Sequence, residues 1–162
     1  MKMTASLWLM NSLTGEFLIQ LRGPNKKRNP NKWETSASGQ LDTGETSLQA
    51  IKREAFEELG LIIPESDFTC LGDFPGLTTT NKHKHFWVYF ASGEYDIKSM
   101  KINASEIAMV KYAKLHEIKK MIGNINCSIQ PEKIKLLENY LKLPQTMLKY
   151  YIPAIYNSLS YN

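Results

Sequence analysis

The chain has few of the residues that build a disulfide framework, a zinc ribbon or a membrane span. Its 162 residues include two cysteines, Cys70 and Cys127, which lie far apart and form no Cys-x-x-Cys pair, so neither a set of disulfides nor a zinc site is indicated. No apolar run approaches the roughly 18 residues that suggest a membrane-spanning helix, and the first residues lack the pattern of a signal peptide. We therefore expect free thiols, no membrane contact and a cytoplasmic location.

The composition is that of an ordinary globular protein. Hydrophobic residues make up 43% and charged residues 22% of the chain, which is typical of a soluble domain. The net charge is +4, but we recognise no nucleic-acid module. Basic residues form one run, Lys26-Lys27-Arg28, with Lys32 nearby, in a loop rich in Asn and Pro. Such a run is usually a solvated loop, and it can also be an interaction site.

The apolar patterns predict strands and helices that together favour a mixed α/β sandwich. A two-stranded hairpin is expected first, followed by a long loop and a helix, and then by strands and two further helices. No internal repeat is present. The expected strands span 5–10, 17–22, 68–71, 85–90 and 109–112, and the expected helices span 47–59, 115–122 and 131–142.

The limits of the helix expected at 47–59 are encoded locally. Thr46 can cap its start, with Gln49 as the reciprocal member of a capping box. Gly60 lies where a helix end favours a residue with positive φ. Four apolar residues share one face and can pack against a sheet: Leu48, Ile51, Ala55 and Leu59.

Three glutamates share another face of this helix. Glu57 and Glu58 follow Glu54 at the i+3 and i+4 positions, which are surface neighbours in a helix. A solvated acidic face is the ordinary interpretation of such a group. Three crowded carboxylates directly after a glycine-bearing loop also predict a site for a hard divalent cation.

A longer pattern of fixed spacing contains these glutamates. Gly39 is followed after five residues by Glu45, and after seven more by the segment Arg53-Glu54-Ala55-x-Glu57-Glu58-x-Gly60-Leu61. The pattern resembles the Nudix box and matches it at every fixed position. Ala55 is a small residue at a position that is apolar in the box. The resemblance implies the Nudix fold, a mixed β-sheet sandwiched between helices with a β-loop-α-loop catalytic motif.

The resemblance also implies a function and a cofactor. Nudix enzymes hydrolyse a diphosphate linkage by attack of water on phosphorus, here in a nucleoside diphosphate derivative or another small organic diphosphate. The cofactor would be Mg²⁺ or Mn²⁺, for which carboxylate oxygens are suitable ligands. By position, the ligands would be Glu54, Glu57, Glu58 and the backbone carbonyl of Gly39.

Further catalytic roles follow by position from the same resemblance. Glu45 and Arg53 would form an ion pair that braces the loop against the helix. The general base differs among Nudix enzymes, and here Glu57 and Glu106 are both candidates. Glu106 precedes an expected strand, where a glutamate is more often a solvated charge than a catalyst.

The segment before the box contains candidate substrate-binding residues. Arg22, Lys26 and Lys32 can supply charge-assisted hydrogen bonds to phosphate oxygens. Trp33 is either a core residue or a surface on which part of the substrate stacks. The expected partner is therefore a small-molecule diphosphate.

Two alternatives to a hydrolase remain open. The segment around the box resembles the Nudix branch that includes isopentenyl diphosphate isomerase, which has a cysteine before the box glycine and a histidine after it. Ser38 and Gln40 occupy these positions here, so hydrolysis is favoured. We place His83 and His85 where the isomerase has paired glutamates and expect a surface or substrate-lining role for them. The other alternative is an inactive nucleotide-binding module.

The end of the chain differs from the preceding sequence. We expect a Nudix domain at 1–143 and an amphipathic helical extension at 144–162, which Pro153 would kink or restart. The extension would pack on its own domain, form a homodimer contact or line the substrate pocket. Its apolar residues are Met147, Leu148, Tyr151, Ile152, Ile155, Tyr156 and Leu159.

Overall fold

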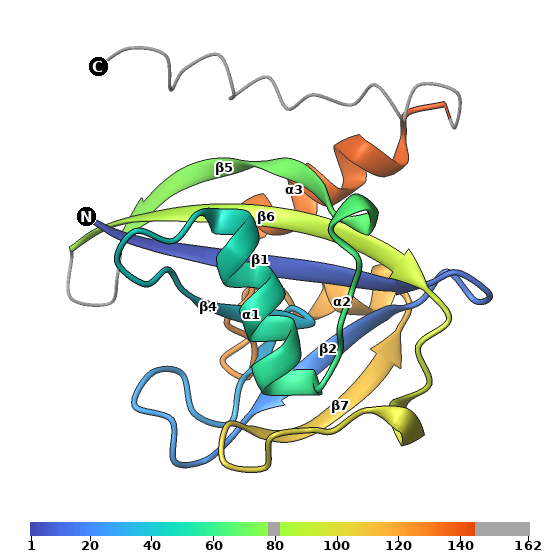
Figure 1. Cartoon of the computed structure of the whole chain (residues 1–162), viewed down its shortest axis with the longest axis horizontal. Helices are drawn as coiled ribbons and strands as arrows, with labels where there is room; N and C mark the ends of the chain where they lie inside the picture. Colours follow the sequence, from blue (N-terminus) through green and yellow to red (C-terminus); the bar gives the residue numbers. More distant parts are fainter. Residues whose placement is uncertain (78–81, 145–162) are drawn as a thin grey trace.

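The computed structural model describes residues 1–77 and 82–144, which form one mixed β-sheet with helices on both faces (Figure 1). The main strand order is β3-β2-β1-β6-β5, with β4 paired to β1 and β7 paired to β2. The strands are β1 (Lys2–Asn11), β2 (Phe17–Arg22), β3 (Trp33–Glu34), β4 (Ala37–Gln40), β5 (Thr69–Leu77), β6 (His83–Gly93) and β7 (Ile107–Ala113). The helices are α1 (Ser47–Leu59), α2 (Leu115–Met121) and α3 (Pro131–Leu141), with 3₁₀ turns at Glu65–Asp67 and Ile97–Ser99.

Strand β1 lies in the middle of the sheet and contributes to two hydrophobic layers. Alternate side chains of a strand point to opposite faces. Leu7 and Leu9 belong to the cluster that contains the apolar residues of α1, whereas Trp8 belongs to the cluster formed with α2 and α3. All three side chains are fully buried. The expected sandwich of a mixed sheet between helices is therefore confirmed, and Figure 1 shows α1 crossing one face of β1 and β6.

One edge of β1 is shared by two strands. The other edge of β1 pairs in parallel with β6. On the shared edge, β2 pairs near the C-terminal end of β1 and β4 pairs near its N-terminal end. Gln20, on β2, connects this strand to the residue before β4 and to α1, because its Nε2 donates to the Ser36 carbonyl at 3.1 Å and to Glu58 Oε2 at 2.8 Å. The division of this edge brings β2, β4 and α1 together around a polar region.

Helix α1 has the limits that its sequence predicts. Thr46 Oγ1 accepts from the Gln49 backbone N–H, and Gln49 Oε1 accepts from the Thr46 backbone N–H. Gly60 ends the helix at a φ of 69°. Ile51 and Leu59 are fully buried against the sheet. Capping and burial together fix the rotation of α1, and this rotation determines where its glutamates lie.

Other elements match the expected ones in kind and differ in length. Strands β1, β5 and β6 are longer than expected, because pairing with neighbours extends them beyond their apolar centres. The short strands β3 and β4 were not expected. The extension predicted at 144–162 lies outside the described residues except at its first position, and its role stays a prediction. None of the helices in the described ranges is long and apolar enough to cross a membrane.

Candidate active site

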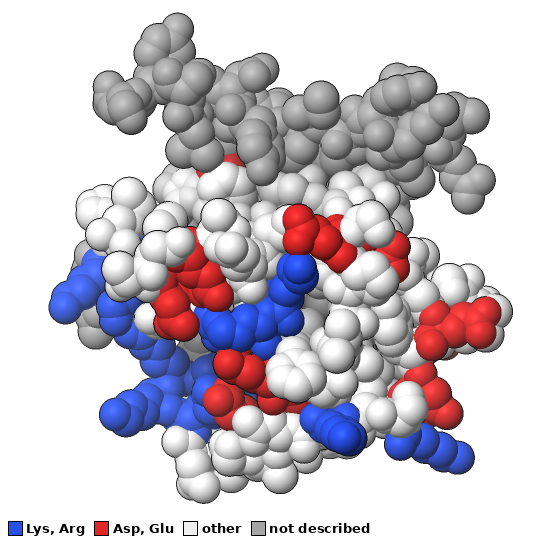
Figure 2. Space-filling view, viewed as in Figure 1, with Lys and Arg blue, Asp and Glu red and all other residues white. Residues whose placement is uncertain are grey.

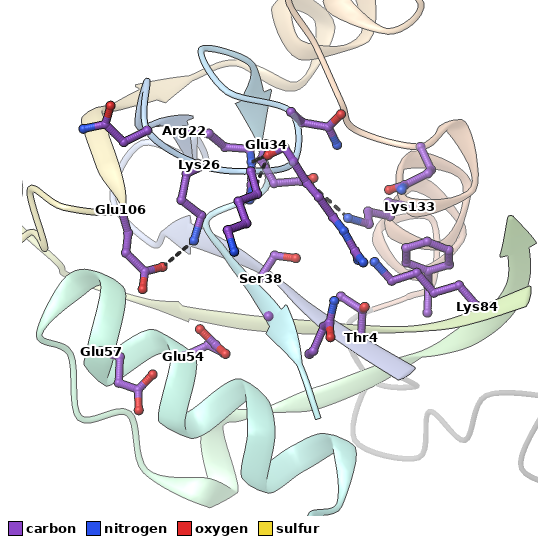
Figure 3. Close-up of a pocket in the computed structure, with 18 residues that line it drawn as sticks. Thr4, Arg22, Lys26, Glu34, Ser38, Glu54, Glu57, Lys84, Glu106 and Lys133 are labelled. Carbon is purple, nitrogen blue, oxygen red and sulfur yellow. Dashed lines mark hydrogen bonds and ion pairs between the residues drawn. The ribbon is translucent and has the colours of Figure 1, made fainter. Parts of the chain in front are cut away.

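A pocket of about 590 Å³ lies between α1, β4, the loop joining β2 to β3, and the start of α3. Glu54 and Glu57 of α1 line one side of it, and Lys84 of β6 and Lys133 of α3 line the other (Figure 3). Figure 2 shows basic side chains gathered over the loop between β2 and β3, next to acidic side chains over α1. The pocket thus has an acidic side and a basic side.

An ion pair fixes the loop before α1 to the helix. Arg53 Nε and Nη2 each lie 2.9 Å from a Glu45 carboxylate oxygen, and Nη2 also donates to the Gln40 carbonyl at 3.0 Å. The hydrogen bond from Arg53 holds the pKa of Glu45 below its ordinary value, and the same bond raises the pKa of Arg53. The predicted pair between Glu45 and Arg53 is confirmed.

Glu54 lies directly against the backbone of β4. Its side chain is nearly buried, and its Oε1 accepts from Arg53 Nη1 at 2.7 Å. A Cβ atom built on Gly39 would lie 1.8 Å from Glu54 Oε1, so this position must be glycine for the carboxylate to approach the strand. Burial raises the pKa of Glu54, and Arg53 opposes that rise.

Glu58 is the most buried of the three box glutamates, with 2% of its surface exposed. Its Oε2 accepts from Gln20 Nε2 at 2.8 Å and from the Ser38 backbone N–H at 3.1 Å. Burial raises its pKa to about 8, and the neighbouring charge of Glu54 adds to the rise. The side chain therefore links α1 to β2 and β4, in a setting that disfavours a negative charge without a cation.

Glu57 and Glu106 line the same pocket from different elements. Glu57 is half exposed and lies 3.3 Å from Arg53 Nη1. Glu106 precedes β7 and forms an ion pair of 2.9 Å with Lys26. The fold therefore brings both candidates for the general base to one site, although 49 residues separate them in the sequence.

Comparison with known proteins identifies the family. The family model for the NUDIX domain matches residues 2–130. The chain belongs to the Nudix family. It is 27% identical over 129 residues to Nudix hydrolase 3 of Arabidopsis thaliana, a match covering 72% of this chain and 16% of that protein. It is 32% identical over 103 residues to an uncharacterised Nudix hydrolase of Listeria innocua, covering 60% of this chain and 55% of the relative. The chain therefore spans about half or less of the length of these relatives.

Solved structures share the Nudix fold. A protein of Deinococcus radiodurans matches with a TM-score of 0.67 at 21% identity, covering 85% of this chain and 82% of the other. The NUDIX domain of Shewanella oneidensis NrtR, solved with ADP ribose, matches with a TM-score of 0.67 at 16% identity, covering 86% and 87%. An Ap4A hydrolase of C. elegans matches with a TM-score of 0.59 at 21% identity, covering 91% and 99%. These identities show a common fold.

The residues of the Nudix box suit a divalent cation, but their carboxylates are engaged with other groups. Within residues 1–77 and 82–144, no three His, Cys, Asp or Glu side chains are gathered as a metal site. The expected crowding of three carboxylates is only partly present, because Arg53 holds Glu54 and Glu57 while Glu58 turns to Gln20. The donors are nevertheless oxygen atoms of the kind that Mg²⁺ and Mn²⁺ bind. A cation would also offset the repulsion that raises the pKa of Glu58.

The four residues predicted to bind substrate have different positions. Lys26 and Arg22 line the pocket, and the Arg22 guanidinium donates to the Arg28 carbonyl at 2.8 and 3.1 Å, which shapes the basic loop. Lys32 and Trp33 are not among the residues that line it. Trp33 packs against the core beside α2 and α3, and the ammonium of Lys111 lies 4.6 Å from its ring. Its role in the structure is therefore packing.

Of the two roles expected for the histidines of β6, a surface role fits the structure and a substrate-lining role does not. Lys84 and Phe86 line the pocket, whereas His83 and His85 are not part of its lining. His85 instead forms an ion pair with Asp73 on β5. Alternation along the strand correctly put both histidines on one face, but it could not show which face borders the pocket.

Several residues of the pocket were not predicted from the sequence. Lys133 is 1% exposed and lies 3.0 Å from Glu34, which is also buried. Thr4 and Gln130 line the same region, and each has a buried side-chain oxygen that has no hydrogen-bond partner among the described residues. One signal was available, since Lys133 occupies a position on the apolar face of α3, where a lysine is unusual.

Proposed function

We propose that this Nudix domain is a metal-dependent hydrolase that cleaves a diphosphate linkage in a nucleoside diphosphate derivative or another small organic diphosphate. The observation that carries the proposal is the pocket with two sides of opposite charge. Glu54 and Glu57 lie on the acidic side, where a divalent cation can bind, and basic residues lie across from them. A diphosphate can bridge the two sides, because its oxygens bind both metal ions and cationic side chains.

The box residues would have the roles that the Nudix pattern implies. Glu54, Glu57, Glu58 and the Gly39 carbonyl would hold Mg²⁺ or Mn²⁺. Such an ion lowers the pKa of bound water and neutralises charge on the phosphates. Arg53 positions Glu54 and Glu57 through its hydrogen bonds at 2.7 and 3.3 Å.

Glu57 and Glu106 are both retained as candidates for the general base. Glu57 is half exposed at the pocket, so water can reach it. Glu106 is paired with Lys26 at 2.9 Å. Binding of a phosphate to Lys26 would release the Glu106 carboxylate to accept a proton. The two candidates therefore differ in whether a bound substrate is needed to free them.

The lining of the pocket favours a polar leaving moiety. Among the described residues that line it, Phe86 is the one aromatic side chain, and most others are charged or carry amides and hydroxyls. Thr4 Oγ1 and Gln130 Oε1 are buried and have no partner within the described ranges, and a ligand with hydroxyl or phosphate groups could satisfy them. An isoprenoid chain would bury apolar surface against charges instead. A nucleoside or sugar moiety is thus the better match.

The isomerase alternative has less support from the site. The Ser38 hydroxyl lies 3.3 Å from the Ser6 hydroxyl, another weakly acidic group. This contact supplies no base that would help Ser38 to exchange protons with a substrate. Incubation with isopentenyl diphosphate separates the two reactions, because the isomerase would form the allylic isomer and the hydrolase would release phosphate.

A substrate screen with a matched pair of variants tests the proposed function. Nucleoside diphosphates and triphosphates, sugar nucleotides, dinucleotides and isoprenoid diphosphates are incubated with Mg²⁺ or Mn²⁺, and the products are followed by phosphorus NMR. The wild type and Glu94→Gln, an exposed residue outside this pocket, should hydrolyse the best substrate equally. Glu57→Gln should lower kcat by about a hundredfold or more, as expected when a group acting on the water or metal is lost. Tight binding of nucleotides without turnover in saturating metal would indicate the inactive binding module.

A further inference from the structure

The basic side of the pocket contains more positive charge than its own carboxylates neutralise. Two of its lysines are paired, Lys26 with Glu106 at 2.9 Å and Lys133 with Glu34 at 3.0 Å. Four further cations line the pocket, and none of them has a carboxylate partner among the described residues: Arg22, Lys27, Arg28 and Lys84.

Lys84 is the most informative of these cations. It lies on β6, and its ammonium is 5.0 Å from the centre of the Phe86 ring. Its pKa is lowered to about 8, chiefly by burial and also by the charges of Arg28 and Lys133, while Glu34 acts in the opposite direction. A partly buried lysine beside two other cations is unfavourable in the empty pocket. A bound anion would remove this disadvantage.

Residues of β1, β6 and α3 surround Lys84. Thr4 of β1 is paired in parallel register with Phe86 of β6, so the two line the same part of the pocket. Thr4 is 5% exposed, and its hydroxyl has no partner within residues 1–77 and 82–144, although it can donate. Lys133, which is 1% exposed, is held in place by its ion pair with Glu34, so the unpaired positive charge beside Thr4 comes from Lys84 and Arg28. A buried donor and several cations therefore converge on one region.

This region is separate from the box glutamates. In Figure 3, Lys84, Thr4 and Lys133 lie across the pocket from Glu57 and Glu106. An anion bound beside Lys84 would therefore not be the group that shares a metal with the acidic side. It would be a second group at the other end of the same ligand.

We propose that Lys84, Arg28 and Thr4 form a subsite for a second phosphate group of the substrate, remote from the diphosphate linkage that is cleaved. The inference rests on the proposed function, because it assumes that a diphosphate occupies the acidic side. A phosphate suits the region better than a carboxylate, since its two negative charges match more than one cation and its oxygens can accept from both the lysine and the threonine. The preferred substrates then carry an additional phosphate on the leaving moiety.

Binding of inorganic phosphate to the metal-free protein tests the subsite directly. Chelated protein at pH 7 is titrated with phosphate, and with acetate as a second probe, by isothermal calorimetry. The variants are Lys84→Gln and Lys98→Gln, which removes the same charge from an exposed residue outside the pocket. We expect saturable binding of phosphate to the wild type and to Lys98→Gln, and weaker binding of acetate. Lys84→Gln should bind phosphate about tenfold more weakly or worse, as expected for loss of one charge-assisted hydrogen bond.

Thermal unfolding of the same variants separates a binding role from a structural one. The Tm of metal-free Lys84→Gln should equal or exceed that of the wild type, because the variant removes a partly buried charge beside other cations. Three results would each overturn the subsite. They are phosphate binding that is unaffected by Lys84→Gln, acetate binding as tight as phosphate binding, and a loss of phosphate affinity in Lys84→Gln that is accompanied by a lower Tm.

Failure of the subsite and failure of the proposed function give different results. If Lys84→Gln binds phosphate normally while Glu57→Gln abolishes metal-dependent hydrolysis, the subsite is wrong and the hydrolase stands. If phosphate binding depends on Lys84 but no diphosphate is hydrolysed, the anion site stands and its assignment to a hydrolase substrate is wrong.

Discussion

Lys133 and Glu34 form an ion pair that is almost completely buried. The two side chains are 1% and 7% exposed, and Lys133 Nζ lies 3.0 Å from Glu34 Oε1. Glu34 also accepts from the Thr35 backbone N–H at 2.8 Å and from the Ser128 hydroxyl at 3.3 Å. Both charges are thus removed from water and held by specific partners.

Replacement of Lys133 by methionine should destabilise the protein strongly. At 3.0 Å, two unit charges in an effective dielectric of about 20 attract each other by about 5 kcal/mol. Removal of one member of a buried pair typically costs about 3 to 5 kcal/mol, because the other charge is left uncompensated. We therefore expect Lys133→Met to lower the free energy of unfolding at pH 7 by about 3 to 5 kcal/mol. The double variant Glu34→Gln/Lys133→Met should recover much of that loss.

The loss should depend on pH in a definite direction. Burial alone would raise the pKa of Glu34, but the charge of Lys133 and the Thr35 N–H outweigh it and hold the pKa below the ordinary value of 4.5. A carboxyl whose pKa is lower in the folded than in the unfolded protein stabilises the fold at pH values above its unfolded-state pKa. This contribution is lost as the pH falls through its folded-state pKa. The difference between the wild type and Lys133→Met should therefore be largest near neutral pH and should shrink below about pH 4.5.

Urea denaturation followed by tryptophan fluorescence at pH 7 and at pH 4 measures these differences. The double variant and the wild type are measured alongside as controls. Lys133→Met could instead lower the free energy of unfolding by less than about 1 kcal/mol at pH 7, the value of an exposed pair, or by the same amount at both pH values. Either result would show that Lys133 does not stabilise a buried charge on Glu34.

Two further substitutions test the β4–α1 contact and the start of the helix. Gly39→Ala places a Cβ atom 1.8 Å from Glu54 Oε1, so the Glu54 carboxylate must move. The kcat for the best substrate should therefore fall by about a hundredfold. An unchanged kcat would show that the close approach of Glu54 to β4 is not needed. Thr46→Ala removes the cap that accepts from the Gln49 N–H, and urea denaturation should show a loss of about 1 kcal/mol with kcat/KM retained. A loss of activity in Thr46→Ala without a change in stability would contradict its assignment as a cap.

The sequence predicts helix α1 well because the signals are local. Thr46, Gln49 and Gly60 act within a few residues of the helix ends, and the spacing of Glu54, Glu57 and Glu58 follows from the helix period. The pair of Glu45 and Arg53 follows from the Nudix pattern. These features need no knowledge of how distant parts of the chain meet.

The basic side of the pocket depends on contacts between distant segments, and local patterns do not reveal it. Lys84 reaches the pocket because β6 pairs in parallel with β1, and Lys133 reaches it because α3 packs behind the sheet. The period of a strand shows that His83 and His85 share a face, but the pairing of β6 decides which face is used. The sequence left Trp33 open between a core role and a substrate-stacking role for a related reason, since its neighbours in the core come from the C-terminal part of the domain.

The central claim is that the box glutamates hold a divalent cation at the acidic side of the pocket. Titration with Mn²⁺, followed by electron paramagnetic resonance of the free ion, measures that binding without any assumption about the substrate. We expect the wild type and Glu94→Gln to bind Mn²⁺ with equal affinity, and Glu54→Gln to bind it about tenfold more weakly or worse, because a charged ligand is lost. Equal Mn²⁺ affinity in the wild type and in Glu54→Gln would contradict the claim.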